Sequence, residues 1–579
     1  MKTKNGNTNL SAAEGDTKNG FAVSLAVIFF LSLAGVGLFY EWACALSSAV
    51  LLVWIFLRLK STGAVTFKTD LFGLSVVFLC AGYFLTFLWA VDRGQAFMGA
   101  LKFFPLVPFI FALTLEKGAS KLIKSLYPYF AAVLTAVSFV LMTLPLTSDY
   151  FTVAGRMSGV FQYPNTFALV ILVGELMLVS GEGRRVLRYV TALFLAVGIF
   201  YTGSRTVMVL AVLSNLVLFF WLMRGNRRNA LILLGVLLVA GGASLGLAFA
   251  GVRPFSRLLS INFGESTFVG RFLYFRDALP VILKHPFGVG YSGYYFMQPS
   301  FQTGLYSVRF IHNDILQFAL DVGWLPCAFF VFAWMKKIFG RGAPFPARVI
   351  LSVFFLHVLF DFDLQFVAVF MLLILLADPD GNEGTVKKKS LSRMRIASVA
   401  LVPVMLYFAV AFAFYSFEFY SGAKTLYPFN TDLRIRELID AETADEMDRI
   451  ADEIIAGNEY ISVAYSAKAR AAYSKGDFGA LIEYKHKALD TARLTIDEYE
   501  DYCVMLINGI SLYEKSGDKS SADVCRREIL YAVEKYYSNL NEMSKLGKMI
   551  MDQPQPAFSP DVESFAQALY AAGYVSSEK

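Results

Sequence analysis

The chain has 579 residues, of which 56% are hydrophobic and 17% are charged, and its mean hydropathy is +0.54. A soluble globular enzyme of this length does not need so much apolar surface, so the composition excludes that class and indicates many membrane spans. Residues 421–579 carry 18 basic and 27 acidic side chains, a net −9, whereas residues 1–420 carry 34 and 19, a net +15. We therefore expect a basic membrane domain followed by an acidic soluble domain, with no nucleic-acid partner.

Apolar segments long enough to cross a bilayer follow a polar lead at residues 1–20. Eleven of them fall near 21–40, 42–57, 71–90, 97–115, 127–146, 165–180, 187–203, 206–223, 230–251, 315–335 and 396–417.

One longer apolar run covers residues 347–377, and as a single helix it would reach about 46 Å across a hydrocarbon core of about 30 Å. Its middle contains the polar stretch "DFDLQ". We interpret the run as two short helices that turn at this stretch, and one long tilted helix is the alternative. Two helices give 13 crossings. The predicted fold is therefore all-α and polytopic, with about 12–13 transmembrane helices over residues 21–420.

Basic clusters mark every second loop, and by the positive-inside rule these loops and the N-terminus are cytoplasmic. The clusters are Lys2/Lys4/Lys18, Arg58/Lys60/Lys68, Lys117/Lys121/Lys124, Arg184/Arg185/Arg188, Arg224/Arg227/Arg228, Lys336/Lys337/Arg341 and Lys387/Lys388/Lys389/Arg393/Arg395. The outer face then receives the loops 147–165 and 201–206, the long loop 252–314, and the "DFDLQ" turn. This arrangement predicts a multi-pass protein of the cytoplasmic (inner) membrane whose C-terminal domain is extracytoplasmic.

The C-terminal segment 421–579 reads as amphipathic helices arranged in hairpins. Two stretches share the order helix, Gly-Asp, helix, and their glycines, Gly476 and Gly517, lie 41 residues apart. That spacing exceeds the 34 residues of a standard tetratricopeptide repeat, so we predict a helical-hairpin solenoid similar to that family. Binding of a protein partner and service as a passive cap are both open as its role.

Charged residues of the membrane domain gather at outer helix ends and outer loops, whereas a transporter would place such charges near the midplane. They are Arg156, Arg205, Arg271, Arg276, His312, Asp361 and Asp363. Each also has a purely structural interpretation, as a helix anchor, a solvated turn or the wet face of an amphipathic helix. Asn165 after Pro164 could simply cap a helix. Together they predict a cationic outer vestibule with a few carboxylates, suited to an anionic headgroup beside lipid.

Four stretches occur in an order that resembles the O-antigen ligase and O-antigen polymerase superfamily. They are "GRMSGVFQYPNTFA" (155–168), "TGSRT" (202–206), "GRFLYFRDALPVILKHPFGVGYSGY" (270–294) and "HNDILQFALDVG" (312–323). The resemblance covers roughly residues 150–380. Asp321 departs from it, because the family usually has Glu there, and the acidic helical tail is an addition.

The resemblance implies a membrane glycosyltransferase that uses an undecaprenyl-diphosphate-linked glycan as donor on the outer side of the membrane. Histidine titrates near neutral pH, so His312 is expected to be the base or the acceptor-orienting group. Arg271 and Arg205 are expected to bind the diphosphate as permanently charged forks. The expected substrate-binding residues are Arg156, Asn165, Arg276, Asn313, Asp314, Asp361 and Asp363.

No cofactor and no metal are expected, because a lone histidine without partner ligands argues against zinc. The pair Asp361 and Asp363 is the one alternative, as a Mg²⁺ site. The acceptor stays open between a growing glycan, a lipid-linked core sugar and a protein. A transporter of lipid-linked glycans and a non-enzymatic assembly scaffold are the alternative functions.

Overall fold

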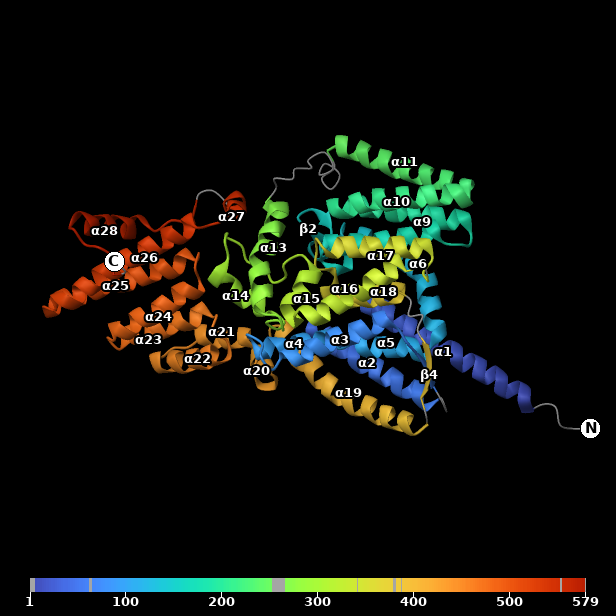
Figure 1. The fold of residues 1–579 in the computed structure, drawn as a ribbon, viewed down its shortest axis with the longest axis horizontal. Coiled ribbons are helices and arrows are strands. Elements are labelled where there is room, and N and C mark those ends of the chain that lie inside the picture. The colour runs from blue at the N-terminus through green and yellow to red at the C-terminus, as the bar shows by residue number, and fades with distance from the viewer. Residues whose placement is uncertain are drawn as a thin grey trace, which may run out of the picture.

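The structure is a computed structural model, and it describes residues 6–61, 65–251, 266–340, 342–377, 382–386, 388–551 and 555–577. Several features discussed above lie outside these residues: the beginning of the polar lead with Lys2 and Lys4, the first part of the long outer loop at 252–265, and the basic residues Arg341 and Lys387. The described chain forms a helical membrane body and a smaller helical C-terminal domain, joined end to end (Figure 1).

The first half of the membrane body is built from helices that run back and forth across it. They are α1 (Gly6–Ala34), η1 (Val36–Leu38), α2 (Glu41–Lys60), α3 (Leu71–Thr86), α4 (Arg93–Phe103), α5 (Leu106–Leu115), α6 (Lys117–Leu141), α7 (Ser148–Phe151), η2 (Gly159–Phe161), α8 (Pro164–Ser180), α9 (Arg185–Thr202), α10 (Arg205–Gly225) and α11 (Arg227–Phe249).

The second half of the body contains the remaining spans and the described part of the long loop. Its helices are α13 (Ser266–Lys284), α14 (Gly293–Phe301), α15 (Asp314–Val322), α16 (Trp324–Phe339), α17 (Phe345–Val358), η3 (Asp363–Gln365), α18 (Val367–Ala377) and α19 (Lys388–Ser416). Two antiparallel strand pairs complete it: β1 (Val65–Thr69) with β4 (Asn382–Val386), and β2 (Thr152–Val153) with β3 (Arg156–Met157).

The predicted fold class is confirmed, because seven described helices are long and apolar enough to cross a membrane and five more are shorter apolar helices. The run 347–377 is two helices and not one long one. The first ends at Val358 and the second begins at Val367, with the turn between them at the polar "DFDLQ" stretch.

Two predicted spans are interrupted where a single regular helix was expected. In the span near 97–115 the helical hydrogen bonding lapses between Phe103 and Leu106, because Pro105 has no amide hydrogen to donate. Phe104 and Pro105 keep helical dihedral angles, so Arg93–Leu115 still crosses as one of the seven spans. The span near 315–335 is interrupted at Gly323, whose φ of +86° ends α15. A Cβ at Gly323 would lie 2.3 Å from the carbonyl oxygen of Pro286, so only glycine fits this crossing.

The two ends of the membrane body carry different structures. The β1–β4 pair joins the loops that follow α2 and α18 at one end, whereas α13, α14 and the C-terminal domain lie at the other end (Figure 1). The pairing places the loop that follows Arg58 and Lys60 and the chain just before α19 at one end of the body.

The C-terminal domain is a stack of antiparallel helices. It comprises α20 (Tyr420–Leu426), α21 (Thr431–Ile439), α22 (Ala444–Gly457), α23 (Ser462–Ser474), α24 (Phe478–Thr491), α25 (Ile496–Ser516), α26 (Lys519–Asn541), α27 (Lys545–Ile550) and α28 (Pro560–Ala571). Gly476 and Gly517 turn the hairpins α23–α24 and α25–α26 with positive φ, and the aspartate after each glycine caps the second helix. A family relationship to tetratricopeptide repeats remains a prediction.

The C-terminal domain touches the outer loop of the membrane body directly. The amide of Ser544 donates to the carbonyl of Thr303 (2.9 Å), and the amide of Arg493 donates to the carbonyl of Pro299 (3.0 Å). Next to the first bond, the backbones of Gly304 and Gly547 approach so closely that a Cβ at Gly547 would lie 2.1 Å from the Thr303 oxygen. The domain is therefore fitted to the chain segment that leads to His312.

Candidate functional site

The carboxylate of Asp361 is the centre of the candidate site. It lies in the turn between α17 and α18 and is buried. The hydroxyl of Tyr163 donates to Oδ1 (2.6 Å), and the amide Nδ2 of Asn165 donates to Oδ2 (2.7 Å). The backbone amide of Phe362 donates to Oδ1 as well (3.1 Å). Groups from α8, its preceding turn and the α17–α18 turn thus converge on one carboxylate.

Two cationic or titratable side chains reach the same carboxylate from the long outer loop and its end. The guanidinium of Arg271 on α13 lies 3.2 Å from Oδ2, and Nδ1 of His312 lies 3.4 Å from Oδ1. Nδ1 faces Asp361, so the other ring nitrogen, Nε2, points away from the carboxylate. With the proton on Nδ1, Nε2 presents a lone pair for accepting a proton.

Arg156 joins this group through Asn165. Its Nη2 donates to Oδ1 of Asn165 (2.7 Å), and its Nε donates to the carbonyl of Thr202 (2.8 Å). The second bond fixes the α9–α10 corner beside the cluster. Arg205 begins α10 one turn beyond Thr202 and is half-buried, so it belongs to this corner and not to the groups that bond Asp361.

The neighbours of Asp361 stabilise the ionised form of its carboxylate. Burial alone would raise the pKa of this carboxyl, but the Arg271 guanidinium, together with the hydrogen bond and charge of His312, outweighs burial and sets the pKa below its usual range. Asp361 is therefore ionised at every pH at which the protein would work. Arg271 pairs with this carboxylate directly, and Arg156 is joined to it only through Asn165.

His312 has a backbone conformation that few residues other than glycine adopt, with φ +54°. Its neighbours hold it in place. The amide of Ile311 donates to the side chain of Gln317 (3.1 Å), and Asn313 donates through Nδ2 to the carbonyl of Leu359 (2.9 Å). Strained backbone of this kind persists only where surrounding contacts fix it, and such positions cluster at functional sites.

Asn313 and Asp314 serve as supports for the loop. Oδ1 of Asn313 accepts from the amide of Leu316 (2.9 Å) and so caps α15. Oδ2 of Asp314 accepts from the amide of Leu364 (2.8 Å), and the Asp314 side chain is fully buried. Both residues tie the start of α15 to the α17–α18 turn, and they hold His312 and Asp361 together.

Asp363 does not form a pair with Asp361. Its Oδ1 accepts from the hydroxyl of Thr166 (2.7 Å), and its Oδ2 lies 2.5 Å from Nδ1 of His357. Asp361 instead bonds Arg271 and His312, so the two carboxylates are directed to different partners. A Mg²⁺ site built on this pair is therefore not supported by the geometry. Among the described residues, no three or more His, Cys, Asp or Glu side chains come together as metal ligands.

Arg276 was expected to bind substrate, but the structure places it on the exposed side of α13. It lies five residues after Arg271, which corresponds to a rotation of about 140° around the helix. Arg271 thus faces Asp361 while Arg276 faces outward. Its placement is that of the wet face of an amphipathic helix.

The glycine-rich stretch after α13 packs against the end of α15. The amides of Val289 and Gly290 donate to the carbonyls of Leu320 (2.7 Å) and Asp321 (3.1 Å). A Cβ at Gly288 would lie 2.6 Å from the Asp321 oxygen. The glycines therefore allow close backbone approach, and Asp321 itself accepts from the hydroxyl of Tyr83 (2.8 Å).

Sequence reasoning missed several polar groups around the site. Tyr163 stands directly before the Pro-Asn pair that was singled out, and its contact with Asp361 could have been suspected from that position. His357 is buried near the end of α17, and its ring is bonded to Asp363. Asp277 on α13 accepts from the amide and hydroxyl of Thr303 (2.8 and 2.7 Å), and it thereby orders the loop toward His312.

A second cluster of buried polar side chains joins α2, α4 and the segment that leads to His312. Nζ of Lys102 lies 3.2 Å from the Tyr291 hydroxyl and 3.7 Å from Glu41, and Tyr291 donates to Glu41 (2.8 Å). Arg309, three residues before His312, reaches the same Glu41 (3.4 Å). Deeper in the body, Nδ2 of Asn215 donates to Glu175 (3.1 Å), the twelfth of the seventeen residues of α8.

Comparison with known proteins gives one match. Residues 190–333 match the family model described as O-antigen ligase. No curated protein and no solved structure matches the chain. The matched segment contains Arg205, Arg271 and His312, whereas Arg156 and Asp361 lie outside it. The match supports the O-antigen ligase superfamily for this chain, and the hydrogen bonds of Asp361 connect the matched segment to the elements on either side of it.

Proposed function

We propose that this multi-pass membrane protein is a glycosyltransferase that transfers or polymerises a glycan carried on undecaprenyl diphosphate, at the outer face of the cytoplasmic membrane. The observation that carries the proposal is the ionised, buried Asp361, which holds Arg271 and His312 beside each other at one end of the membrane body. The O-antigen ligase match over residues 190–333 supports the same reaction class.

The roles of the residues follow from the chemistry of the transfer. The bond between the anomeric carbon of the donor sugar and the diphosphate oxygen breaks, and a bond from that carbon to the acceptor oxygen forms. His312 takes the proton of the acceptor hydroxyl on Nε2, while Asp361 holds the ring through Nδ1. Arg271, Arg156 and Arg205 bind the diphosphate, whose negative charge grows as it leaves. No metal is assigned a role.

The outer location rests on the alternation of basic loops and on the contact of the C-terminal domain with α13, the helix whose Arg271 pairs with Asp361. Figure 1 shows α13 and the C-terminal domain at the same end of the body. A cysteine introduced at Ser516, which is exposed at the α25–α26 turn, tests it. The five natural cysteines are all buried, so the introduced thiol is the one expected to react. An impermeant thiol reagent should label it in intact cells once any outer barrier is removed. If the thiol is labelled only after lysis, the C-terminal domain lies on the cytoplasmic side and the predicted topology is wrong.

Reconstitution tests the function itself. The purified full-length protein would be mixed with a polyprenyl-diphosphate-linked oligosaccharide, and both products would be measured: released polyprenyl diphosphate and the new glycan conjugate. Matched reactions with and without EDTA should run at equal rates. The conjugate formed by a wild-type strain and lost in a deletion strain identifies the acceptor as glycan, lipid or protein. Movement of the intact donor across a liposome membrane without any product would instead support a transporter.

A transporter of lipid-linked glycans is the second candidate, because Glu175 and Asn215 place a polar pair in the interior of two spans. Glu175 lies on the same helix as Asn165, about 15 Å further along it, and the pair is small by comparison with the Asp361 cluster. The described charges that bond to one another around Asp361 come from the helix ends and loops at one end of the body. That distribution favours chemistry at the surface over passage through the middle.

A further inference from the structure

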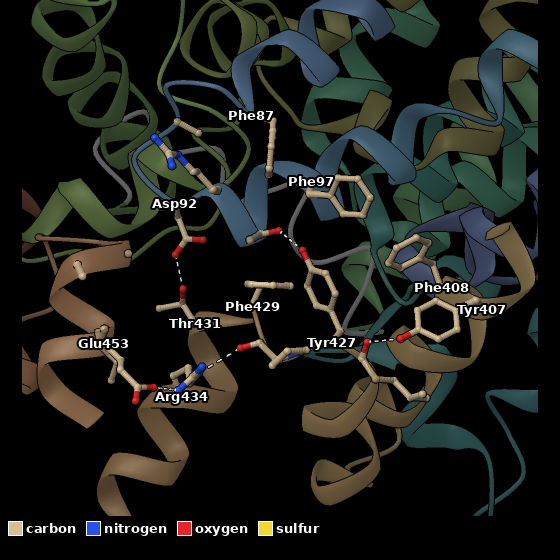
Figure 2. Close-up of a pocket in the computed structure, with 18 residues that line it drawn as sticks. Phe87, Asp92, Phe97, Tyr407, Phe408, Tyr427, Phe429, Thr431, Arg434 and Glu453 are labelled. Atoms are coloured by element: carbon tan, nitrogen blue, oxygen red, sulfur yellow. Dashed lines mark hydrogen bonds and ion pairs between the residues drawn. The ribbon is translucent and has the colours of Figure 1, made fainter. Parts of the chain in front are cut away.

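A cavity of about 820 Å³ lies where three parts of the chain meet: the α3–α4 corner, the outer end of α19, and the start of the C-terminal domain. Figure 2 shows the side chains around it. Its lining shares no residue with the Asp361 cluster. The volume falls within the range of about 300–1,000 Å³ that is typical of sites for small molecules.

One side of the cavity is aromatic (Figure 2). The rings of Phe97 and Phe408 lie 5.1 Å apart, and Tyr427 packs against both, at 6.3 and 6.2 Å. Beside them Tyr407 donates to the carbonyl of Leu426 (2.7 Å) and remains 46% exposed. Aromatic rings with a polar tip are enriched where a span meets the lipid headgroups.

The aromatic side continues onto surfaces that face lipid. On α19 the exposed residues Val404 and Val410 lie one turn before and one turn after Tyr407. At the end of α3, Leu85 and Leu88 are exposed in the same way.

The opposite side of the cavity is charged. Arg434 forms an ion pair with Glu453, and Arg449 from outside the cavity pairs with the same carboxylate (2.6 Å). Arg93 lies exposed on the rim at the first turn of α4. The nearby carboxylate of Asp92 is buried and is occupied by bonds from the amide of Gln95, the hydroxyl of Thr431 and the side chain of Asn458.

Two arginines, Arg93 and Arg434, line the cavity on this side, and Arg449 just outside it shares Glu453 with Arg434. Counting Glu453 and the buried Asp92 against these three arginines, the group keeps one positive charge, and Arg93 has no carboxylate partner among the described residues. A ligand that fits both sides has an apolar chain and an anionic head. Arginine favours phosphate because its planar fork donates two hydrogen bonds to neighbouring oxygens.

We propose that this cavity binds an anionic glycerophospholipid of the membrane, with its phosphate at Arg93 and Arg434 and one acyl chain along Phe97, Phe408 and Tyr407. The bound lipid fills the junction between the membrane body and the C-terminal domain, because Phe408 belongs to the body and Arg434 to the domain. This proposal is independent of glycosyl transfer, since no residue of the Asp361 cluster takes part in it.

Native mass spectrometry of the full-length protein in detergent tests the proposal. The probes are dioleoyl phosphatidylglycerol and dioleoyl phosphatidylcholine, which share their chains and differ in headgroup charge. We expect one retained phosphatidylglycerol per protein and at least about tenfold less phosphatidylcholine. Equal retention of both would overturn the anionic headgroup. An undecaprenyl phosphate that displaces the phosphatidylglycerol at a lower concentration would show that the cavity serves the carrier lipid instead.

Three variants locate the bound lipid. The double variant Arg93→Gln/Arg434→Gln should bind about tenfold less phosphatidylglycerol, the size expected for lost charge-assisted hydrogen bonds. Ala456→Trp fills the cavity without changing any charge, and it should abolish retention as well. Arg449→Gln is the matched control, because Arg449 also pairs with Glu453 but lies outside the lining. All variants must first elute as the wild type does in size exclusion.

Each outcome of these measurements either supports or overturns the proposed lipid site. Loss of lipid in the double variant and in Ala456→Trp, with normal retention in Arg449→Gln, supports the site. Retention at the wild-type level in Ala456→Trp places the lipid elsewhere and overturns the proposal. Equal loss in Arg449→Gln would show that the effect comes from a disturbed domain junction, and this result overturns the proposal too.

Discussion

Two regions of this protein bury charged side chains, and they neutralise them in different ways. In the C-terminal domain Lys485 on α24 is fully buried and contacts Glu498 (3.2 Å) and Asp501 (2.6 Å) on α25, while Arg470 on α23 pairs with Asp501 (2.9 Å). Two cations meet two carboxylates, and all four come from three successive helices. In the membrane body, Asp361 is approached by Arg271, by His312 and, through Asn165, by Arg156.

This difference between the Lys485 cluster and the Asp361 cluster indicates which of the two is suited to chemistry. A balanced cluster such as that of Lys485 has its charges satisfied within the domain, so its effect is to fix helix positions. The Asp361 cluster adds a histidine to its ion pair and draws its members from elements far apart in the chain. A side chain that can exchange a proton beside a fixed cation is the arrangement that transfer from a departing diphosphate needs.

The largest effect is expected from His312→Ala. Loss of a general base typically costs about 10²–10⁴-fold in rate, whereas donor binding should be retained, because His312 is assigned to the acceptor proton. Donor retention and transfer would be measured on the same preparation. Loss of donor binding in His312→Ala would remove the residue from the proton-transfer role.

Arg271→Ala should cost about 10²–10³-fold in transfer, because it removes a charged donor aimed at the leaving diphosphate. Donor binding should weaken in parallel. Arg271→Lys should recover only part of the rate, since an ammonium cannot form the two-pronged bond. Arg276→Ala is the control, because Arg276 faces outward on the same helix, and it should stay within a few-fold of wild type. Equal losses in the two alanine variants would contradict the assignment of Arg271.

Asp361→Asn should destabilise the cluster by about 3–5 kcal/mol, since it leaves Arg271 partly buried without its countercharge. The effect has a defined pH dependence. The pKa of Asp361 is lowered in the folded protein, so its carboxylate adds stability that is fully present above the ordinary aspartate pKa of about 3.9 and is lost as the pH falls from there through the lowered folded pKa. The melting temperatures of wild type and variant should therefore begin to converge below about pH 4 and continue to do so as the pH falls further. A constant difference down to lower pH would argue against an ionised Asp361.

Much of the fold could be predicted from the sequence, because a membrane span appears in the sequence as a long apolar run. The division of 347–377 followed from one observation, the polar "DFDLQ" stretch in a run too long for one span. The breaks at Pro105 and Gly323 were not predicted, because their neighbours are as apolar as the rest of their spans. The break at Gly323 depends on contact with Pro286, which no local pattern records.

The residues of the candidate site could be named from the sequence, but the hydrogen bonds and ion pairs that connect them could not. The motifs placed Arg156, Arg271 and His312 at outer ends of helices, and the structure brings these residues to one carboxylate. Asp361 and Asp363 looked equivalent because they stand two residues apart in a short turn. The 3₁₀ turn that begins at Asp363 directs them to different partners, and only the backbone geometry distinguishes them.

The two regions are connected through the contact of α27 with the outer loop, and Gly547→Ala tests that connection. The added Cβ would lie 2.1 Å from the Thr303 oxygen, so the loop or α27 must shift. Because Thr303 is bonded to Asp277 on the helix that carries Arg271, we expect about a tenfold loss of transfer. Gly479→Ala is the control, since its new Cβ meets only the end of the Asp477 side chain, at 3.5 Å. Unchanged transfer in Gly547→Ala would mean that the domain does not position the loop.

The smallest effect on transfer is expected from Lys485→Met, although its effect on stability should be large. The substitution leaves Glu498 and Asp501 without their buried cation, and breaking a buried ion pair in this way costs about 3–5 kcal/mol. The C-terminal domain should therefore melt at a lower temperature. Transfer per folded molecule, measured well below that temperature, should match wild type, because the Lys485 cluster is balanced and offers no charge to a substrate. Lys487→Met is the control two residues along the same helix, where the pair with Glu483 is exposed and contributes little. If Lys485→Met reduced transfer as strongly as Arg271→Ala while the domain stayed folded, charge balance would not distinguish a scaffold cluster from a reactive one.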